Sequence, residues 1–211
     1  MWFIKKILIG LHLLSPVRDI ICSAGKPVKD GSILPLLFSD PKGCAAIHEA
    51  GHILACWQLP SIKYISCAKI STRASKVAIT YEYAPSYRSF ASDTLLISLA
   101  GLAAELEIFR YFQAKSSRDD LRHALRAARI INRTSHRAFT PISSLMLDFA
   151  DIFVNEPSYS VNQIMNWHLM RTQNLIRQHD VKLIQLALAL LDRDELSHND
   201  IYRVIGARPC R

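Results

Sequence analysis

Residues 43–57 read GCAAIHEAGHILACW, and this stretch decides the fold. Small and apolar side chains stand on both sides of an H-E-x-x-H run at residues 48–52. A run of this composition predicts a buried helix with a few polar side chains. Pro41 stands just ahead of the predicted helix and Pro60 ends it.

The spacing inside this run points to metal chemistry. On a helix, positions i and i+4 share a face, so the imidazoles of His48 and His52 can reach one ion. Buried histidines need polar partners, and a metal supplies them. Glu49 lies beside the first histidine and is free to take a proton from a metal-bound water, which is the arrangement typical of zinc peptidases. We therefore predict Zn²⁺ as the cofactor.

Two other residues of the helix, Gly51 and Cys56, bear on its packing. Gly51 makes the helix about 1 kcal/mol less stable than alanine would, so it indicates either a close approach of another element or substrate, or a tolerated glycine. Cys56 lies four residues after His52, and its axial distance from His48 is about 12 Å. That is too far for both to bind one ion, so we interpret Cys56 as a core residue.

Composition places the chain among ordered proteins with one ordinary domain. It has 211 residues, of which 50% are hydrophobic. Glycines and prolines are frequent in 23–42, so we divide the chain into an apolar N-terminal segment with a linker, 1–39, and a domain, 40–211. Five cysteines without a C-x-x-C pair indicate reduced thiols and a cytoplasmic location.

The formal net charge of +8 is concentrated in one region. Basic residues recur near every fourth position from 110 to 137, which predicts a basic helical stripe. The stripe is either a solvated face or a contact for anionic lipid or an acidic partner. We find no nucleic-acid-binding motif and expect no nucleic-acid partner. Its members are Arg110, Lys115, Arg118, Arg122, Arg126, Arg129, Arg133 and Arg137.

The first 14 residues carry a short apolar run after two lysines. The run is far shorter than the roughly 20 residues that span a bilayer. We interpret it as a short amphipathic helix that docks on the domain or on a membrane surface, with peripheral membrane contact through residues 1–22. A signal peptide is the alternative.

The remaining patterns predict a mostly α (α+β) fold with a small sheet or hairpin after the H-E-x-x-H helix. Two short β-branched and aromatic runs, 62–70 and 77–83, predict strands, the second at a sheet edge. Residues 134–160 predict further helix and loop. The other helices are expected at 94–110, 116–131 with a Ser116–Asp119 capping box, 161–191, and 198–205 capped by Ser197 and Asp200.

A catalytic zinc usually has a third protein ligand, and the chain offers several. A histidine at position 58 would extend the motif, but this residue is Gln58. The residues alone leave four candidates for the third ligand: Glu105, Asp119, Asp120 and His123.

Three motifs in order, 46–52, 101–105 and 117–124, read AIHEAGH, GLAAE and SRDDLRHA. Together they resemble the peptidase domain of the FtsH-type ATP-dependent zinc metalloproteases. The resemblance implies that His48 and His52 bind zinc and that Glu49 is the base. It implies Asp120 as the third ligand, with Asp119 as the partner of the helix cap. It also implies that Glu105 either orients a histidine ring or is purely structural.

The sequence departs from the family pattern in three respects, one of which is that the segment after Ile131 lacks the expected glycine-bearing turn. The sequence also contains no G-x-x-x-x-G-K-[ST] phosphate loop, so we expect a peptidase without its own ATPase. Leu102 stands where the family usually has arginine, which bears on assembly and on the substrate groove.

The resulting hypothesis is a zinc-dependent endopeptidase that cuts flexible or unfolded protein segments. The alternative is a catalytically inactive zinc-binding FtsH-like domain that acts as an adaptor or membrane-surface interaction protein. Candidate partners are a protein or peptide substrate, a separate ATPase and a second copy of the chain.

Overall fold

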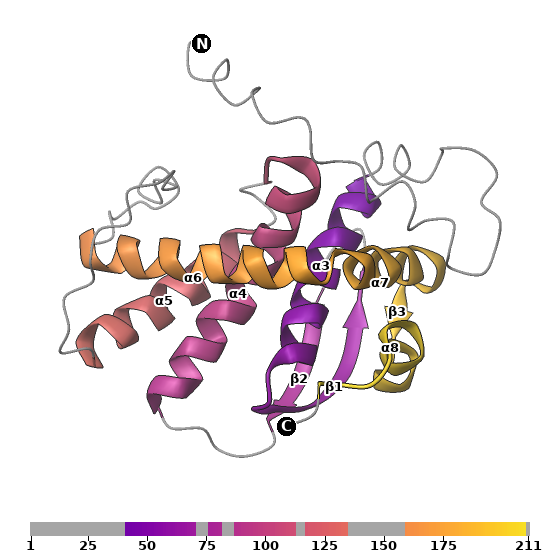
Figure 1. Cartoon of the computed structure of the whole chain (residues 1–211), viewed down its shortest axis with the longest axis horizontal. Coiled ribbons are helices and arrows are strands. Elements are labelled where there is room, and N and C mark those ends of the chain that lie inside the picture. The colour runs from indigo at the N-terminus through magenta and orange to yellow at the C-terminus, as the bar shows by residue number, and fades with distance from the viewer. Residues whose placement is uncertain (1–40, 71–75, 82–86, 113–116, 135–158, 210–211) are drawn as a thin grey trace, which may run out of the picture. The chain divides into compact units, whose positions relative to one another are not determined.

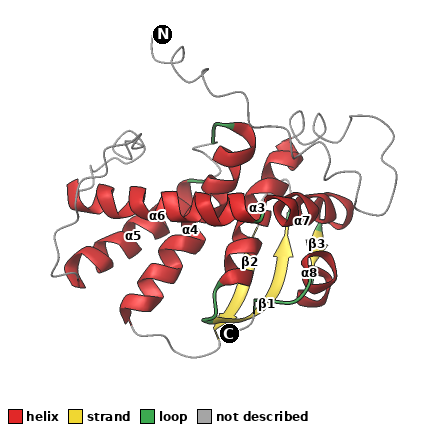
Figure 2. Cartoon of the chain, in the orientation of Figure 1, coloured by secondary structure: helices red, strands yellow, loops and turns green. Residues whose placement is uncertain are grey.

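The computed structural model describes residues 41–70, 76–81, 87–112, 117–134 and 159–209, all within one compact unit, Leu37–Arg211 (Figure 1). These residues form a mostly helical fold with a small antiparallel sheet, which confirms the predicted mostly α (α+β) class (Figure 2). The elements are α3 (Pro41–Gln58), β1 (Ile62–Lys69), β2 (Lys76–Tyr81), α4 (Tyr87–Phe109), α5 (Arg118–Thr134), α6 (Tyr159–Gln178), α7 (Asp180–Arg193), β3 (Glu195–Leu196) and α8 (His198–Ile205).

The helix predicted from residues 43–57 is confirmed as α3, which lies at the centre of the core. It contacts α4, α6, α7 and both longer strands. Its apolar side chains are fully buried on several sides, including Ile47, Ile53, Leu54 and Trp57. A helix buried around most of its circumference holds its polar side chains in a fixed environment, because the packed neighbours leave few alternative rotamers.

The predicted strands are confirmed, and they lie beside α3. The strand order is β2-β1-β3, and both neighbours of β1 run antiparallel to it. Within the described sheet, β2 therefore has one neighbour and is an edge strand, as predicted. Cys56 is 0% exposed, which confirms it as a core residue.

Helix α4 begins seven residues earlier than predicted, at Tyr87 rather than residue 94. It is long and apolar enough to cross a membrane by length and composition. Here it is a core helix, because Leu95, Leu99 and Leu102 are fully buried and it packs against α3, α5 and α6.

The single helix predicted for residues 161–191 is wrong, because two helices occupy this range. His179 leaves the helical conformation, with φ −130° and ψ 30°, and a new helix begins at Asp180. The Asp180 carboxylate accepts a hydrogen bond of 2.7 Å from the Val181 amide, one of the free N–H groups of that first turn. Neither glycine nor proline marks this break, and apolar spacing continues on both sides of it.

The other predicted helices are confirmed with small shifts of their ends. Ser197 and Asp200 form the predicted capping box at the start of α8. The helix predicted at 116–131 is α5, whereas the Ser116 cap lies outside the described residues. The predictions for 1–39, including membrane contact through 1–22, also lie outside them, as do residues 135–158 of the segment predicted as further helix and loop.

Candidate metal centre

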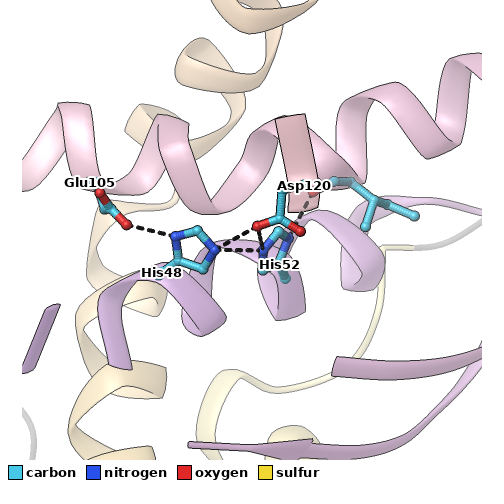
Figure 3. A network of polar contacts seen from close by, with 5 residues as sticks. His48, His52, Glu105 and Asp120 are labelled. Atoms are coloured by element: carbon cyan, nitrogen blue, oxygen red, sulfur yellow. Dashed lines mark hydrogen bonds and ion pairs between the residues drawn. The ribbon is translucent and has the colours of Figure 1, made fainter. Parts of the chain in front are cut away.

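Three side chains from two helices converge on one point (Figure 3). His48 and His52 lie one turn apart on α3, and Asp120 lies in the first turn of α5. Asp120 Oδ2 is 2.8 Å from His48 Nε2 and 3.3 Å from His52 Nε2, and the two nitrogens are 3.1 Å apart. This group could hold a metal ion.

Helix α4 anchors the far side of both imidazole rings. His48 Nδ1 lies 2.7 Å from Glu105 Oε1, and His52 Nδ1 lies 2.8 Å from the carbonyl oxygen of Ile97. A carbonyl oxygen and a carboxylate accept hydrogen bonds, so each Nδ1 carries the proton and donates it. In the neutral form of each ring, Nε2 therefore presents its lone pair toward Asp120, which is the tautomer that binds metals.

The donor set fits a tetrahedral divalent ion. Two imidazole lone pairs and a carboxylate oxygen are all acceptors, so a cation stabilises their close approach. Ligand atoms about 2.0–2.1 Å from a tetrahedral zinc lie roughly 3.3 Å from one another, close to the observed separations. Two histidines and one carboxylate are a ligand set of catalytic zinc, with a fourth position open.

The electrostatics of the group also favour a cation. Burial alone would lower the pKa of His48, but its hydrogen bonds to Asp120 and Glu105 raise that pKa to about 10. Burial alone would raise the pKa of Asp120, but hydrogen bonds from His48 and His52 hold it well below its usual range. The two carboxylates therefore attract positive charge to His48, and a proton or a metal ion can supply it.

Glu49 is a buried carboxylate next to His48 in the sequence. It is not one of the three side chains that converge on the candidate metal position. It is 6% exposed, and burial raises its pKa, while the nearby histidines lower it. A carboxylate with a raised pKa is a better proton acceptor than one in water. Its position next to His48 in the sequence suits a base for a water at the ion.

Two glycines explain how α3 and α4 come so close at the site. A Cβ on Gly101 would lie 2.5 Å from His48 Nε2, and a Cβ on Gly51 would lie 2.8 Å from the Ala104 Cβ and still closer to the Ala100 carbonyl oxygen. Of the two alternatives for Gly51, the close approach of another element is the one observed.

The four candidates for a third ligand occupy different environments. Asp120 faces the two histidines, and Glu105 is 2% exposed and bonds the far side of His48. The Asp119 side chain is 80% exposed and pairs with Arg122 at 2.8 Å, and His123 is exposed. The carbonyl of Ile97 was not predicted as a partner of His52, because a backbone acceptor leaves no sequence signal.

Comparison with known proteins shows a distant similarity to a protease component. No family model matches the chain. The chain is 25% identical over 191 residues to the mitochondrial inner membrane m-AAA protease component AFG3L2 of Mus musculus. The match covers 82% of this chain and 23% of the relative, so the chain spans about a quarter of that protein's length. The similarity is to a protease component and suggests a protease-related function.

Proposed function

We propose that this chain is a zinc-dependent endopeptidase that hydrolyses peptide bonds in flexible or unfolded protein segments. The observation that carries the proposal is the pair of Nε2 atoms, 3.1 Å apart, that converge with Asp120 while α4 holds each Nδ1. His48, His52 and Asp120 are the proposed ligands, and Glu105 is proposed to orient His48. The similarity to a protease component supports the same class of function.

The proposed chemistry divides between the ion and Glu49. When bound, zinc supplies a Lewis acid that polarises the substrate carbonyl and lowers the pKa of water to about 7. Glu49 takes a proton from the attacking water and delivers it to the leaving amine nitrogen as the carbon–nitrogen bond breaks. Its raised pKa suits both roles, because it can hold the proton between the two steps.

The proposed partners follow from the same comparison. The relative is named as a component of a protease, so we propose that this chain works with a separate ATPase or with further copies of itself. The relative's location suggests the mitochondrial inner membrane as an alternative to the cytoplasm. Imaging a tagged full chain separates the two locations.

The deciding experiment is cleavage of unfolded casein by zinc-loaded protein, with Glu49→Gln in parallel. We expect cleavage by the wild type and a loss of at least about 100-fold in the variant, since a general base contributes that much. Zinc content measured on both proteins is the control, because the variant keeps all three proposed ligands. Zinc bound without any cleavage by the wild type would instead favour an inactive adaptor.

A further inference from the structure

Five arginines lie in a band along the outer face of α5, which we call the arginine row. Its members are Arg118, Arg122, Arg126, Arg129 and Arg133, and all five are exposed. At 3.6 residues per turn they fall within about 80° of the helix circumference and extend over about 22 Å. The apolar residues of α5 are buried on the other side, so the row belongs to the solvent face.

The row is largely without compensating charge in the described part of the chain. Arg122 pairs with Asp119 at 2.8 Å, whereas the other four members form no ion pair with any described residue. Several members are four residues apart, and like charges at that spacing destabilise a helix. An anionic partner would remove this repulsion on binding.

The row begins at the candidate metal centre. Arg118 lies in the same turn of α5 as Asp120, and the other members continue along the helix away from it. Asp120 faces inward to the histidines, while Arg118 faces solvent. A chain lying along the row would therefore have one end near the centre.

The dimensions and side chains of the row fit an extended acidic polypeptide. Row members four residues apart are separated by about 6 Å along the helix. Alternate side chains of an extended strand are about 6.6–6.8 Å apart, so acidic residues at every second position would meet successive arginines. Arginine binds carboxylates through two parallel hydrogen bonds, which lysine does not.

A flat anionic membrane fits the row less well. The row is confined to one side of a single helix, and Asp119, whose side chain is 80% exposed, lies beside it and would face the lipid. The apolar side of α5 is buried in the protein, so it has no apolar face to insert into a bilayer.

From these observations we infer that the arginine row binds acidic, extended segments of the polypeptide substrate and leads them to the metal centre. The inference names the substrate class of the proposed peptidase and to that extent rests on the proposed function. Peptide binding is measured separately from peptide cleavage, so the inference and the proposed function can fail independently of each other.

The test uses Glu49→Gln protein and a fluorescein-labelled peptide of alternating glutamate and serine, followed by anisotropy. We expect binding that weakens with salt and is absent for the lysine–serine peptide. The triple variant Arg126→Gln, Arg129→Gln, Arg133→Gln should bind about tenfold more weakly. A matched triple variant at exposed positions elsewhere, Lys63→Gln, Arg193→Gln, Arg203→Gln, removes the same charge and should bind like the parent.

Three results would overturn the inference. One is equal binding by the row variant and its parent, and another is equal weakening by the two triple variants, which would indicate net charge alone. The third is row-dependent binding to phosphatidylserine vesicles without binding to the acidic peptide. Circular dichroism and thermal unfolding of each variant exclude misfolding, and we expect the row variant to be no less stable than its parent.

Discussion

Gly101 lies against the imidazole of His48 so closely that a Cβ there would be 2.5 Å from both Cε1 and Nε2 of the ring. The glycine belongs to α4 and the histidine to α3, so this contact sets the spacing of the two helices at the candidate metal centre. It also shows that the ring has no room to move toward α4.

The first prediction concerns this contact. Gly101→Ala should displace His48, weaken zinc binding by at least about tenfold and lower the free energy of unfolding by about 1–3 kcal/mol. Zinc affinity is measured by competition with a chromogenic chelator. Gly206→Ala is the control, since a Cβ there meets nothing within 4 Å, although its φ of 78° strains alanine. The control should lose some stability and keep zinc affinity, and equal affinity in both variants would contradict the prediction.

A second prediction separates two neighbouring carboxylates. Asp120→Asn should lower zinc affinity by at least about 100-fold, because one anionic ligand becomes a neutral amide. Asp119→Asn changes the same chemistry one residue away, at a side chain that is 80% exposed, and should bind zinc like the wild type. Isothermal titration with zinc measures both variants. A larger effect at position 119 would exclude Asp120 as the third ligand.

The third prediction is a pH dependence of metal binding. In the metal-free protein, burial lowers the pKa of His48, but its carboxylate partners raise it to about 10, so the ring is protonated at pH 7. Zinc must displace that proton, and its apparent affinity should rise about tenfold per pH unit between pH 6 and 8. Titration at pH 7 in two buffers of different ionisation enthalpy should show release of about one proton. Release of none would mean that His48 is neutral before zinc binds.

A fourth prediction concerns the C-terminal end of α3. The Arg208 guanidinium donates hydrogen bonds to several backbone carbonyls and lies over the Trp57 ring, 5.3 Å from its centroid. The acceptors are the carbonyl oxygens of Cys56, Trp57, Leu59, Ile62 and Lys63. Two of these acceptors, the carbonyls of Cys56 and Trp57, belong to the last turn of α3, where a cation is favourable.

Arg208→Lys should therefore lower the free energy of unfolding by about 2–3 kcal/mol. The single ammonium group of lysine cannot donate to all the carbonyl oxygens that surround the planar guanidinium group of arginine. Urea denaturation measures the change. Arg203→Lys is the control, since its side chain is 76% exposed, and it should change stability by less than about 0.5 kcal/mol. A similar, small loss in both variants would show that Arg208 does not stabilise the end of α3.

Local spacing was sufficient to predict the helix and the shared face of His48 and His52, because the i, i+4 rule is a property of one helix. The same rule does not identify the third ligand, because that residue belongs to another helix. The residues alone leave four acidic or imidazole side chains as candidates for the third ligand, and only the resemblance to a known family points to Asp120. The structure separates them by exposure and by which face of α5 or α4 each occupies.

Features that depend on backbone geometry could not be predicted. The break at His179 has no glycine or proline, and the Ile97 carbonyl has no side-chain signature. Arg208 is one of three arginines near the C-terminus, and nothing in its neighbourhood indicates that its partners lie about 150 residues earlier.

Asp120 is 72 residues from His48 in the sequence, and it belongs to a different helix. An ion bound by both would close a large loop of the chain, much as a disulfide does, and would remove conformational entropy from the unfolded state. The metal would then act as a reversible cross-link between α3 and α5. Occupancy of the centre would consequently control how tightly α5 and its arginines are held against the rest of the domain.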